Sequence, residues 1–297
     1  MKIIRKIKNR YKQFKSHPVT NGDEFKGLYK YIEFNIKNRI FNEIQYKWIG
    51  SLKFIARKGD AGIVGNIYFG VYEFEESLFL LHFLQKQDTF LDVGANLGHF
   101  SLLLSGIKGC KSIAIEPVPK TYKQLQKQIQ LNNLGELISP FNIGVSNFDG
   151  KLYFSTDKGT MDRIVNERYK NAVQVPVLSL DSILNEQVPL AIKIDVEGHE
   201  KQALEGGMTV LKDDRLKVLI LELNGSGEKF GVSDDEIYAE VLQLGFKPFA
   251  YDVANRQLIK LKSYNKTQFN TIFIRDEEFV TNRLKKADLI TIRGRKF

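Results

Sequence analysis

A short run of ionisable residues follows an apolar segment in the second half of the chain. The stretch LAIKIDVEGHEKQALEGG begins at Leu190 and carries Asp195, Glu197 and His199 within five residues. A strand that ends at Asp195 releases these side chains at the carboxyl edge of a sheet, where parallel α/β sheets bind their ligands. Histidine titrates near neutral pH, so His199 is the first candidate for a base that takes a proton from a hydroxyl. We expect Asp195 to orient that base or to hold the hydroxyl, and Glu197 to hydrogen-bond to further hydroxyls.

The same stretch also has a purely structural interpretation. Acidic side chains are favoured at the start of a helix by the helix dipole, which accounts in part for Glu197 and Glu200. It does not account for His199, or for an acid that closes an apolar strand. The sequence therefore favours a chemical role for Asp195, Glu197 and His199.

An earlier stretch, TFLDVGANLGHFSLLLSG, predicts a binding turn between a strand and a helix. It is not a complete dinucleotide fingerprint, because Asn96 replaces the middle glycine of G-x-G-x-x-G, and Asp92 would repel a diphosphate. A cationic ligand without phosphate suits a carboxylate at this place better. S-adenosylmethionine (SAM) has a sulfonium and an amino group and no phosphate. We therefore expect Asp92, Gly94, Asn96 and Gly98 to contact SAM.

The next expected strand adds a second carboxylate to this site. Glu116 follows Asp92 by 24 residues in the segment SIAIEPVP. An acid at that spacing in a strand–helix–strand unit accepts hydrogen bonds from ribose hydroxyls. Asn142, after the third strand, is a candidate for the adenine edge, and Asp195 borders the same site. The alternative is that Asp92 and Glu116 are turn-forming acids at strand ends, but the glycines and the spacing together favour SAM.

Two further groups of residues are weaker candidates. The segment LILELNG places Glu222 and Asn224 27 and 29 residues after Asp195, and oxygens at adjacent strand ends could bind Mg²⁺. The sequence favours instead a hydrogen bond from Glu222 to substrate or backbone. In the segment 155–165, Thr160 and Asp162 are candidates to reach the acceptor of the reaction.

The elements that must position these residues alternate between strands and helices, which predicts a mostly parallel sheet with helices on both faces. Residues 1–50 look helical or irregular, and 51–75 look like short strands with glycines between them. Ser233 and Glu236 form a capping box for the last expected helix of the alternating region. The expected strands are 89–93, 112–115, 137–145, 173–178, 190–194 and 218–223, followed by a closing antiparallel pair, and the expected helices are 75–84, 97–105, 119–131, 181–184, 200–211 and 234–244.

Composition and charge restrict the class of protein. With one cysteine, Cys110, in 297 residues, the chain can form no internal disulfide, which favours a reducing compartment. No run of eighteen apolar residues and no signal-peptide core is present, so we expect a cytoplasmic protein. The net charge of +9 is concentrated at the two ends of the chain. Nucleic-acid enzymes carry positive charge around their cleft, so this distribution argues against a nucleic-acid partner.

The first fifteen residues hold seven lysines and arginines and no acid, and Ile3, Ile7, Tyr11 and Phe14 recur at helical spacing. We expect this amphipathic helix to pack its apolar stripe on the main domain. The alternative is a peripheral contact of residues 1–15 with an anionic membrane, at its inner face.

Four segments together resemble one enzyme family. FLDVGANLGHFSL, IEPVP, NIGVSNFDGKLYF and IKIDVEGHEKQALEGG resemble the FkbM family of SAM-dependent methyltransferases, in the family's order and over roughly Glu73 to Leu223. The resemblance implies a Rossmann-like class I methyltransferase fold, with a seven-stranded, mostly parallel sheet and a last hairpin that inserts an antiparallel strand. It also implies methyl transfer to a hydroxyl of a sugar, a glycan or glycolipid, or a natural product.

The organisation that follows has three parts. Residues 1–72 form an N-terminal extension of a basic helix and short strands, 73–280 form the methyltransferase domain, and 281–297 form a basic tail. A nucleic-acid methyltransferase is disfavoured, because Asp195-Val196-Glu197-Gly198 stands where such enzymes carry an Asn/Asp-Pro-Pro-aromatic motif. A third alternative is a methyltransferase-like binding protein that has lost its activity. The oligomeric state stays open.

Overall fold

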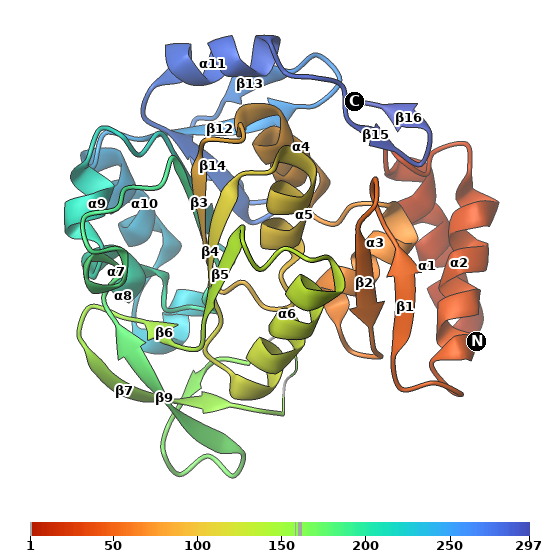
Figure 1. The fold of residues 1–297 in the computed structure, drawn as a ribbon, viewed down its shortest axis with the longest axis horizontal. Helices are drawn as coiled ribbons and strands as arrows, with labels where there is room; N and C mark the ends of the chain where they lie inside the picture. The colour runs from red at the N-terminus through yellow and green to blue at the C-terminus, as the bar shows by residue number, and fades with distance from the viewer. Residues whose placement is uncertain (1, 158, 160–161) are drawn as a thin grey trace.

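An eight-stranded sheet forms the centre of the computed structural model, which describes residues 2–157, 159 and 162–297 (Figure 1). Its strand order is β13-β12-β14-β11-β10-β3-β4-β5, and the five strands from β11 to β5 are parallel. β14 lies antiparallel between β11 and β12, which is the inserted strand that the family resemblance implies. The bounds are β3 Thr89–Val93, β4 Lys111–Ile115, β5 Ile138–Phe141, β10 Ala191–Ile194, β11 Val218–Glu222, β12 Lys247–Asp252, β13 Gln257–Lys260 and β14 Asn270–Ile274.

Helices cover both faces of this sheet, as the alternating pattern predicts (Figure 1). Consecutive strand residues such as Phe90 and Leu91 belong to separate hydrophobic clusters, because successive side chains of a strand point to opposite faces. One cluster packs against α4, α5 and α11, and the other packs against α7 to α10. The helices are α4 Phe74–Phe83, α5 His99–Lys108, α6 Pro119–Leu131, α7 Leu180–Leu184, α8 Glu200–Glu205, α9 Met208–Lys212, α10 Asp234–Gln243 and α11 Glu277–Lys285.

The Rossmann-like α/β class is confirmed, and the structure differs from the prediction in several details. The sheet has eight strands rather than seven, because β13 forms a hairpin with β12 and extends the edge. The segment 137–145 forms two strands, and the second, β6, belongs to a separate four-stranded sheet of order β6-β9-β7-β8. The bounds of this small sheet are β6 Gly144–Val145, β7 Gly150–Ser155, β8 Ile164–Val165 and β9 Ala172–Leu178.

The helix expected over 200–211 is interrupted between α8 and α9 at Gly206 and Gly207. A Cβ atom on Gly206 would lie 2.1 Å from the backbone oxygen of Ser146, so only glycine allows the chain after β6 to approach this closely. The capping box of Ser233 and Glu236 is present at the start of α10, as the sequence predicts.

The N-terminal segment packs beside α5 and α6 and consists of two helices, a hairpin and a third helix (Figure 1). The expectation of strands throughout 51–75 is wrong after residue 56, because Ala61–Phe69 forms helix α3. Six of its nine residues are buried, so the apolar run shows no one-sided periodicity that would separate a helix from a strand. The bounds are α1 Lys2–Ser16, α2 Glu24–Lys37, β1 Ile44–Lys47, β2 Lys53–Ala56 and α3 Ala61–Phe69.

The basic C-terminus is bound to this N-terminal segment. Arg295 donates to the backbone oxygen of Pro18, and Arg293 donates to the backbone oxygen of Tyr68. Both arginines lie in a terminal hairpin of β15 Thr291–Ile292 and β16 Arg295–Lys296. Residue 280 lies within helix α11. The predicted domain boundaries after residues 72 and 280 stay predictions.

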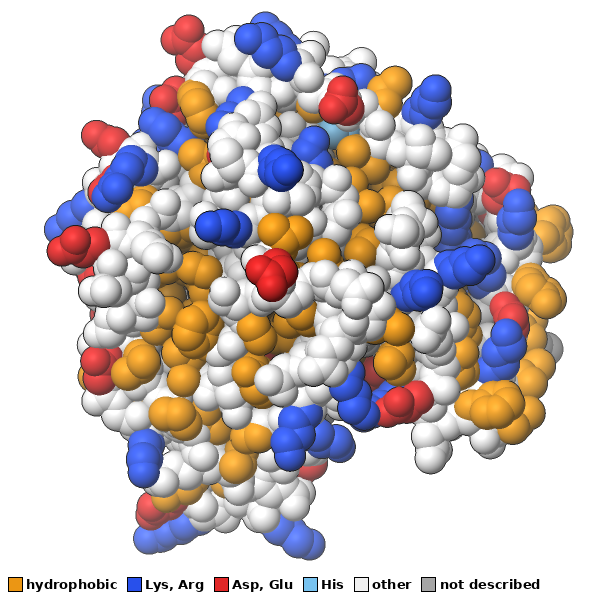
Figure 2. Space-filling view, viewed as in Figure 1, with side chains coloured by type: hydrophobic (Ala, Val, Ile, Leu, Met, Phe, Trp, Pro, Cys, Tyr) orange, Lys and Arg blue, Asp and Glu red, His pale blue; other side chains and the backbone are white. Residues whose placement is uncertain are grey.

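The two N-terminal helices differ in how they use their apolar side chains. Phe14 of α1 is fully buried, whereas Ile7 and Tyr11 are half-buried, and the ring of Tyr11 lies 5.7 Å from the ring of Phe25 on α2. Helix α2, in contrast, exposes large apolar side chains, and Figure 2 shows hydrophobic groups along the right margin of the molecule, where Figure 1 places α2. Within the part of the chain that the structure describes, no helix is both long and apolar enough to cross a membrane.

Replacement of Gly206 by alanine tests the close approach between α8 and the chain after β6. The added Cβ atom has to displace the Ser146 backbone, so we expect a loss of about 1–3 kcal/mol in the free energy of unfolding. Gly135→Ala is the matched control, because a Cβ atom there meets nothing within 4 Å. Urea denaturation of both variants measures the difference, and equal stability of the two would contradict the described packing.

Candidate active site

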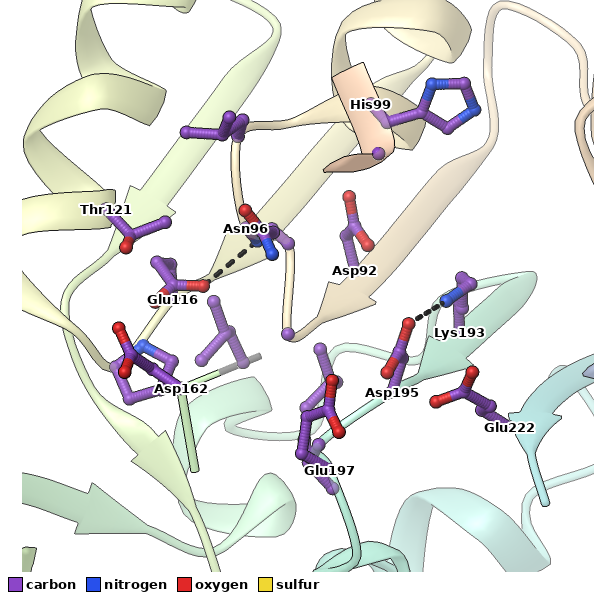
Figure 3. A pocket seen from close by; sticks show the side chains of 18 of the residues that line it. Asp92, Asn96, His99, Glu116, Thr121, Asp162, Lys193, Asp195, Glu197 and Glu222 are labelled. Atoms are coloured by element: carbon purple, nitrogen blue, oxygen red, sulfur yellow. Dashed lines mark hydrogen bonds and ion pairs between the residues drawn. The ribbon is translucent and has the colours of Figure 1, made fainter. Parts of the chain in front are cut away.

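A cavity of about 350 Å³ opens at the carboxyl ends of β3, β4, β10 and β11 (Figure 3). The end of each of these strands contributes one carboxyl group, so residues far apart in the sequence meet around one space. The cavity also reaches α3 and Tyr72 from the N-terminal side and Phe154 from the small sheet. The predicted site residues that line it are Asp92, Gly94, Asn96, Glu116, Asp162, Asp195, Glu197, His199, Glu222 and Asn224.

The turn after β3 is held tightly against the end of β10. Gly94 has a φ of +83°, and a Cβ atom there would lie 1.9 Å from the backbone oxygen of Asp195. Asn96 also has a positive φ, of +52°. Gly98 does not line the cavity; it precedes α5 with a φ of +84°, and a Cβ atom there would meet Leu125 at 2.6 Å. The glycines therefore bring the turn close to β10 and close to α6.

Asp92 lies at the base of the cavity and is already engaged with α5. Its Oδ2 accepts hydrogen bonds from the backbone N–H and the hydroxyl of Ser101, at 3.2 and 2.6 Å. Burial raises the pKa of this carboxyl group above its ordinary value. Asp92 thus fixes the start of α5 relative to β3 and adds an acidic group to the wall.

Glu116 is hydrogen-bonded to the turn that follows β3 and to the loop that follows β4. Its Oε2 accepts from the backbone N–H of Asn96 at 3.0 Å, and its Oε1 accepts from that of Val118 at 2.9 Å (Figure 3). Burial raises the pKa of Glu116 to about 8. Asn142 is not among the cavity-lining residues; its amide donates to the backbone oxygens of Glu116 and Pro117 and supports this loop from behind.

A buried lysine that the sequence reasoning missed stands at the centre of the acidic groups. Lys193 Nζ lies 2.8 Å from Asp195 Oδ2 and 3.7 Å from Glu73 Oε2, and 5.1 Å from the centre of the Phe100 ring. Burial alone lowers the pKa of Lys193, but the charges of Asp195 and Glu73 outweigh burial and raise it. A lysine inside the apolar run LAIKID was the available signal, because lysine is almost never fully buried without a partner.

Glu222 shares a hydrogen bond with Asp195. Burial and the negative charge of Asp195 raise the pKa of Glu222 to about 9, whereas Lys193 overcomes the effect of burial on Asp195 and lowers the pKa of that residue. At neutral pH Glu222 therefore holds a proton and donates it to ionised Asp195.

These contacts do not support the magnesium alternative. Asp195 is paired with Lys193, Glu222 is protonated, and Asn224 Oδ1 accepts from the backbone N–H of Ser226. Among the described residues, no group of three or more His, Cys, Asp or Glu side chains is arranged to hold a metal ion.

His199 and Glu197 reach the cavity from a turn with unusual backbone angles. Glu197 has a φ of +54° and Gly198 a φ of +101°, and a Cβ atom on Gly198 would lie 2.4 Å from the backbone oxygen of Ser226. His199 Nε2 lies 3.2 Å from Ser146 Oγ, and its Nδ1 is buried without a hydrogen-bond partner. Burial lowers the pKa of His199 to about 4, so the ring is neutral at pH 7.

Glu200, which follows the same turn, has a structural role. Its Oε1 accepts from the backbone N–H groups of Val196 and Gly198, at 3.2 and 3.1 Å. Glu200 thus has the structural role that acids commonly have at the start of a helix. The carboxyl group of Glu197, in contrast, is directed into the cavity (Figure 3). Of the two loop candidates, Asp162 lines the cavity, and Thr160 lies outside the described residues.

Comparison with known proteins gives the family. The model of the methyltransferase FkbM domain matches residues 92–248. The chain belongs to the FkbM methyltransferase family. The matched residues begin at Asp92 of β3 and include every strand end that lines the cavity. The resemblance of the four sequence segments to this family is thus confirmed.

Individual relatives are distant. The hexuronic acid methyltransferase AglP of Haloferax volcanii is 24% identical over 148 residues, which are 49% of this chain and 59% of that protein. A methyltransferase FkbM structure from Methylobacillus flagellatus has a TM-score of 0.45 and 13% identity, over 83% of this chain and 58% of that one. A putative methyltransferase from Streptococcus mutans, solved in complex with SAH, has a TM-score of 0.40 and 13% identity, over 67% of this chain and 94% of that one.

The protonated state of Glu222 makes a prediction about stability and pH. The folded protein keeps this proton up to a pKa of about 9, and the unfolded chain loses it above about 4.5. This contribution to stability is therefore full below about 4.5 and is lost as pH rises through about 9. Glu222→Gln keeps a donor for Asp195 and has no proton to lose. We therefore expect the melting temperature of the variant, relative to that of wild type, to increase as pH rises from 5 to about 9.

Thermal melts of wild type and Glu222→Gln across this pH range measure the effect. Glu136→Gln, at an exposed position, is the matched control and is expected to follow wild type at every pH. A constant difference between Glu222→Gln and wild type would show that Glu222 is ionised in the folded protein.

Proposed function

We propose that this methyltransferase transfers a methyl group from SAM to a hydroxyl group of a neutral, sugar-type acceptor. The observation that carries the cofactor assignment is the position of Glu116. Its carboxyl group is fixed by two backbone N–H groups at the end of β4, across from the Gly94 turn. This is where a ribose bound beyond the second strand presents its hydroxyls.

The charge of the cavity supports a cationic cofactor without phosphate. Lys193 is the one lysine or arginine among the described lining residues, and it is already paired with Asp195 and Glu73. A diphosphate would find no free cation here, whereas a sulfonium and an ammonium group are attracted. Seven acidic residues line the same cavity: Glu73, Asp92, Glu116, Asp162, Asp195, Glu197 and Glu222. Because Glu222 is protonated and burial raises the pKa of Glu116 to about 8, these two add hydrogen-bonding groups rather than negative charge at pH 7.

The residues around the β10 turn are suited to take up the proton of the acceptor. SAM, when bound, supplies an electrophilic methyl group. His199 Nε2 and Ser146 Oγ share a hydrogen bond at 3.2 Å, and in the tautomer in which Nε2 donates, the lone pair is on Nδ1. The neutral Nδ1 has no other partner and accepts the hydroxyl proton. Glu197 and Asp195 hold the acceptor hydroxyls beside it.

Two observations support a neutral sugar as the acceptor: the name of the relative AglP and the acidic side chains of the cavity. AglP acts on a hexuronic acid according to its name, which supports a sugar. The acidic side chains here disfavour an acceptor with its own carboxylate, because like charges repel in a poorly solvated site. They hydrogen-bond well to neutral hydroxyls. The experiments must separate this proposal from three alternatives: a natural-product acceptor, a nucleic-acid acceptor, and a binding protein without activity.

Glu116→Gln tests the cofactor site. Glutamine offers one oxygen in place of two, so either a backbone N–H or the ribose loses its acceptor, and we expect SAM affinity to fall at least about tenfold. Isothermal titration calorimetry measures the affinity, with exposed Glu136→Gln as the control that stays at the wild-type value. Wild type that binds no SAM would favour the inactive binding protein.

His199→Ala tests the base. We expect turnover to fall at least about 100-fold, because no other neutral acceptor replaces Nδ1, while SAM affinity stays within about twofold. Mass detection of methyl gain on a panel of neutral sugars, glycolipids and uronic acids measures turnover. A loss of SAM affinity without a loss of turnover per bound cofactor contradicts the role of His199. Preference for uronic acids contradicts the proposed acceptor.

A further inference from the structure

Helix α2 carries a row of apolar side chains on its outer face. Phe25, Tyr29, Ile32 and Ile36 are spaced four, three and four residues apart, which places them on one side of a helix. Ile40 and Phe41 continue the row in the turn that follows α2. We call these six residues the α2 stripe. Their exposed fractions lie between 41% and 75%.

The α2 stripe is not the face by which this helix packs on the protein. Gly27 and Phe34 form the buried side, where the ring of Phe14 lies 2.9 Å from the position of a Cβ atom on Gly27. Helix α2 is therefore apolar on its inner and its outer side. Contiguous exposed apolar surface of this kind marks an interaction site on a soluble protein.

Basic side chains flank the α2 stripe. The ring contact between Tyr11 and Phe25 places α1 directly beside it, and the first fifteen residues of the chain hold seven basic residues and no acid. The exposed members are Arg5, Lys6, Lys8, Lys12 and Lys15. Figure 2 shows lysine and arginine side chains next to the hydrophobic groups on this margin of the molecule.

The other flank of α2 adds further cations. Lys30, Lys37, Lys47 and Arg293 line a cavity of about 300 Å³ between α2 and β1, with Glu33 as the one acid among its described lining residues. Glu33 is paired with Lys37 at 2.5 Å. An apolar row with cations on both sides has the pattern of a helix that lies in the plane of an anionic membrane surface.

We propose that the protein docks peripherally on an anionic lipid bilayer through the α2 stripe. The apolar side chains enter the boundary between headgroups and acyl chains, and the lysines and arginines of α1 and α2 lie at the level of the lipid phosphates. The alternative of a second copy of this chain brings two basic α1 helices together, which charge repulsion opposes. The proposal differs from membrane contact by α1 itself, because the exposed large apolar side chains belong to α2 and the turn after it, whereas Phe14 of α1 is buried and Ile7 and Tyr11 are half-buried.

Vesicle flotation with the full chain tests this proposal. We expect binding to vesicles of phosphatidylcholine with phosphatidylglycerol, and at least about tenfold weaker binding to phosphatidylcholine alone. Phe25→Ser with Ile36→Ser is expected to reduce partitioning to anionic vesicles at least about tenfold. The matched control is Ile259→Ser with Leu289→Ser, which removes two apolar side chains of 51% exposure outside the α2 stripe and keeps wild-type binding.

Further measurements distinguish a lipid bilayer from a second copy of the chain as the partner of the α2 stripe. Thermal melts are expected to be unchanged in both double variants, because the replaced side chains are exposed. Lys6→Gln with Lys12→Gln is expected to weaken binding to anionic vesicles as well, so that both apolar and basic groups contribute. Three results overturn the proposal: no binding of wild type to anionic vesicles, binding that depends on the lysines but not on the α2 stripe, or a dimer in solution that Phe25→Ser with Ile36→Ser dissociates.

Discussion

The ammonium group of Lys193 allows several carboxyl groups to share one buried cavity. Asp195 and Glu73 lie within 4 Å of it, and the proton held by Glu222 removes a further negative charge beside Asp195. Without this lysine, ionised Asp195 would keep the hydrogen bond from Glu222 but would have no ion-pair partner at the end of a buried strand, which is costly. The ion pair thus keeps the end of β10 polar while the strand itself stays in the core. The chemistry proposed for the β10 turn depends on this arrangement.

Close backbone contacts then place the other groups around this centre. The chain after β3 lies against Asp195 because residue 94 has no side chain, and the chain after β10 lies against Ser226 because residue 198 has none. Glu116 bridges the β3 turn and the β4 loop through two backbone N–H groups. Each carboxyl group is therefore positioned by contacts between neighbouring strand ends rather than by its own rotamer alone. This explains why residues from four separate segments of the sequence line one cavity.

Much of this arrangement could be predicted from the sequence, because strand periodicity and acids at strand ends are local signals. Strand β3 and helix α6 have the predicted bounds. Helix α3 could not be predicted, because it is buried on most sides and gives no helical periodicity. The place of Asn142 in the chain predicts a contact with the adenine edge, and its amide in the structure donates to two backbone oxygens beside the cavity. The ion pairs of Lys193 and the exposure of the outer face of α2 could not be predicted from the sequence. Both depend on the tertiary structure, which determines what surrounds a lysine and which side of a helix is covered.

We propose that the acidic cavity selects a cationic nucleoside and excludes a diphosphate. The most direct measurement is a parallel calorimetric titration of the wild-type protein with SAM and with NADH, which carries the diphosphate of the competing ligand class. We expect saturable binding of SAM with one site per chain and no detectable heat from NADH. Saturable binding of NADH, or the absence of SAM binding, would contradict this proposal.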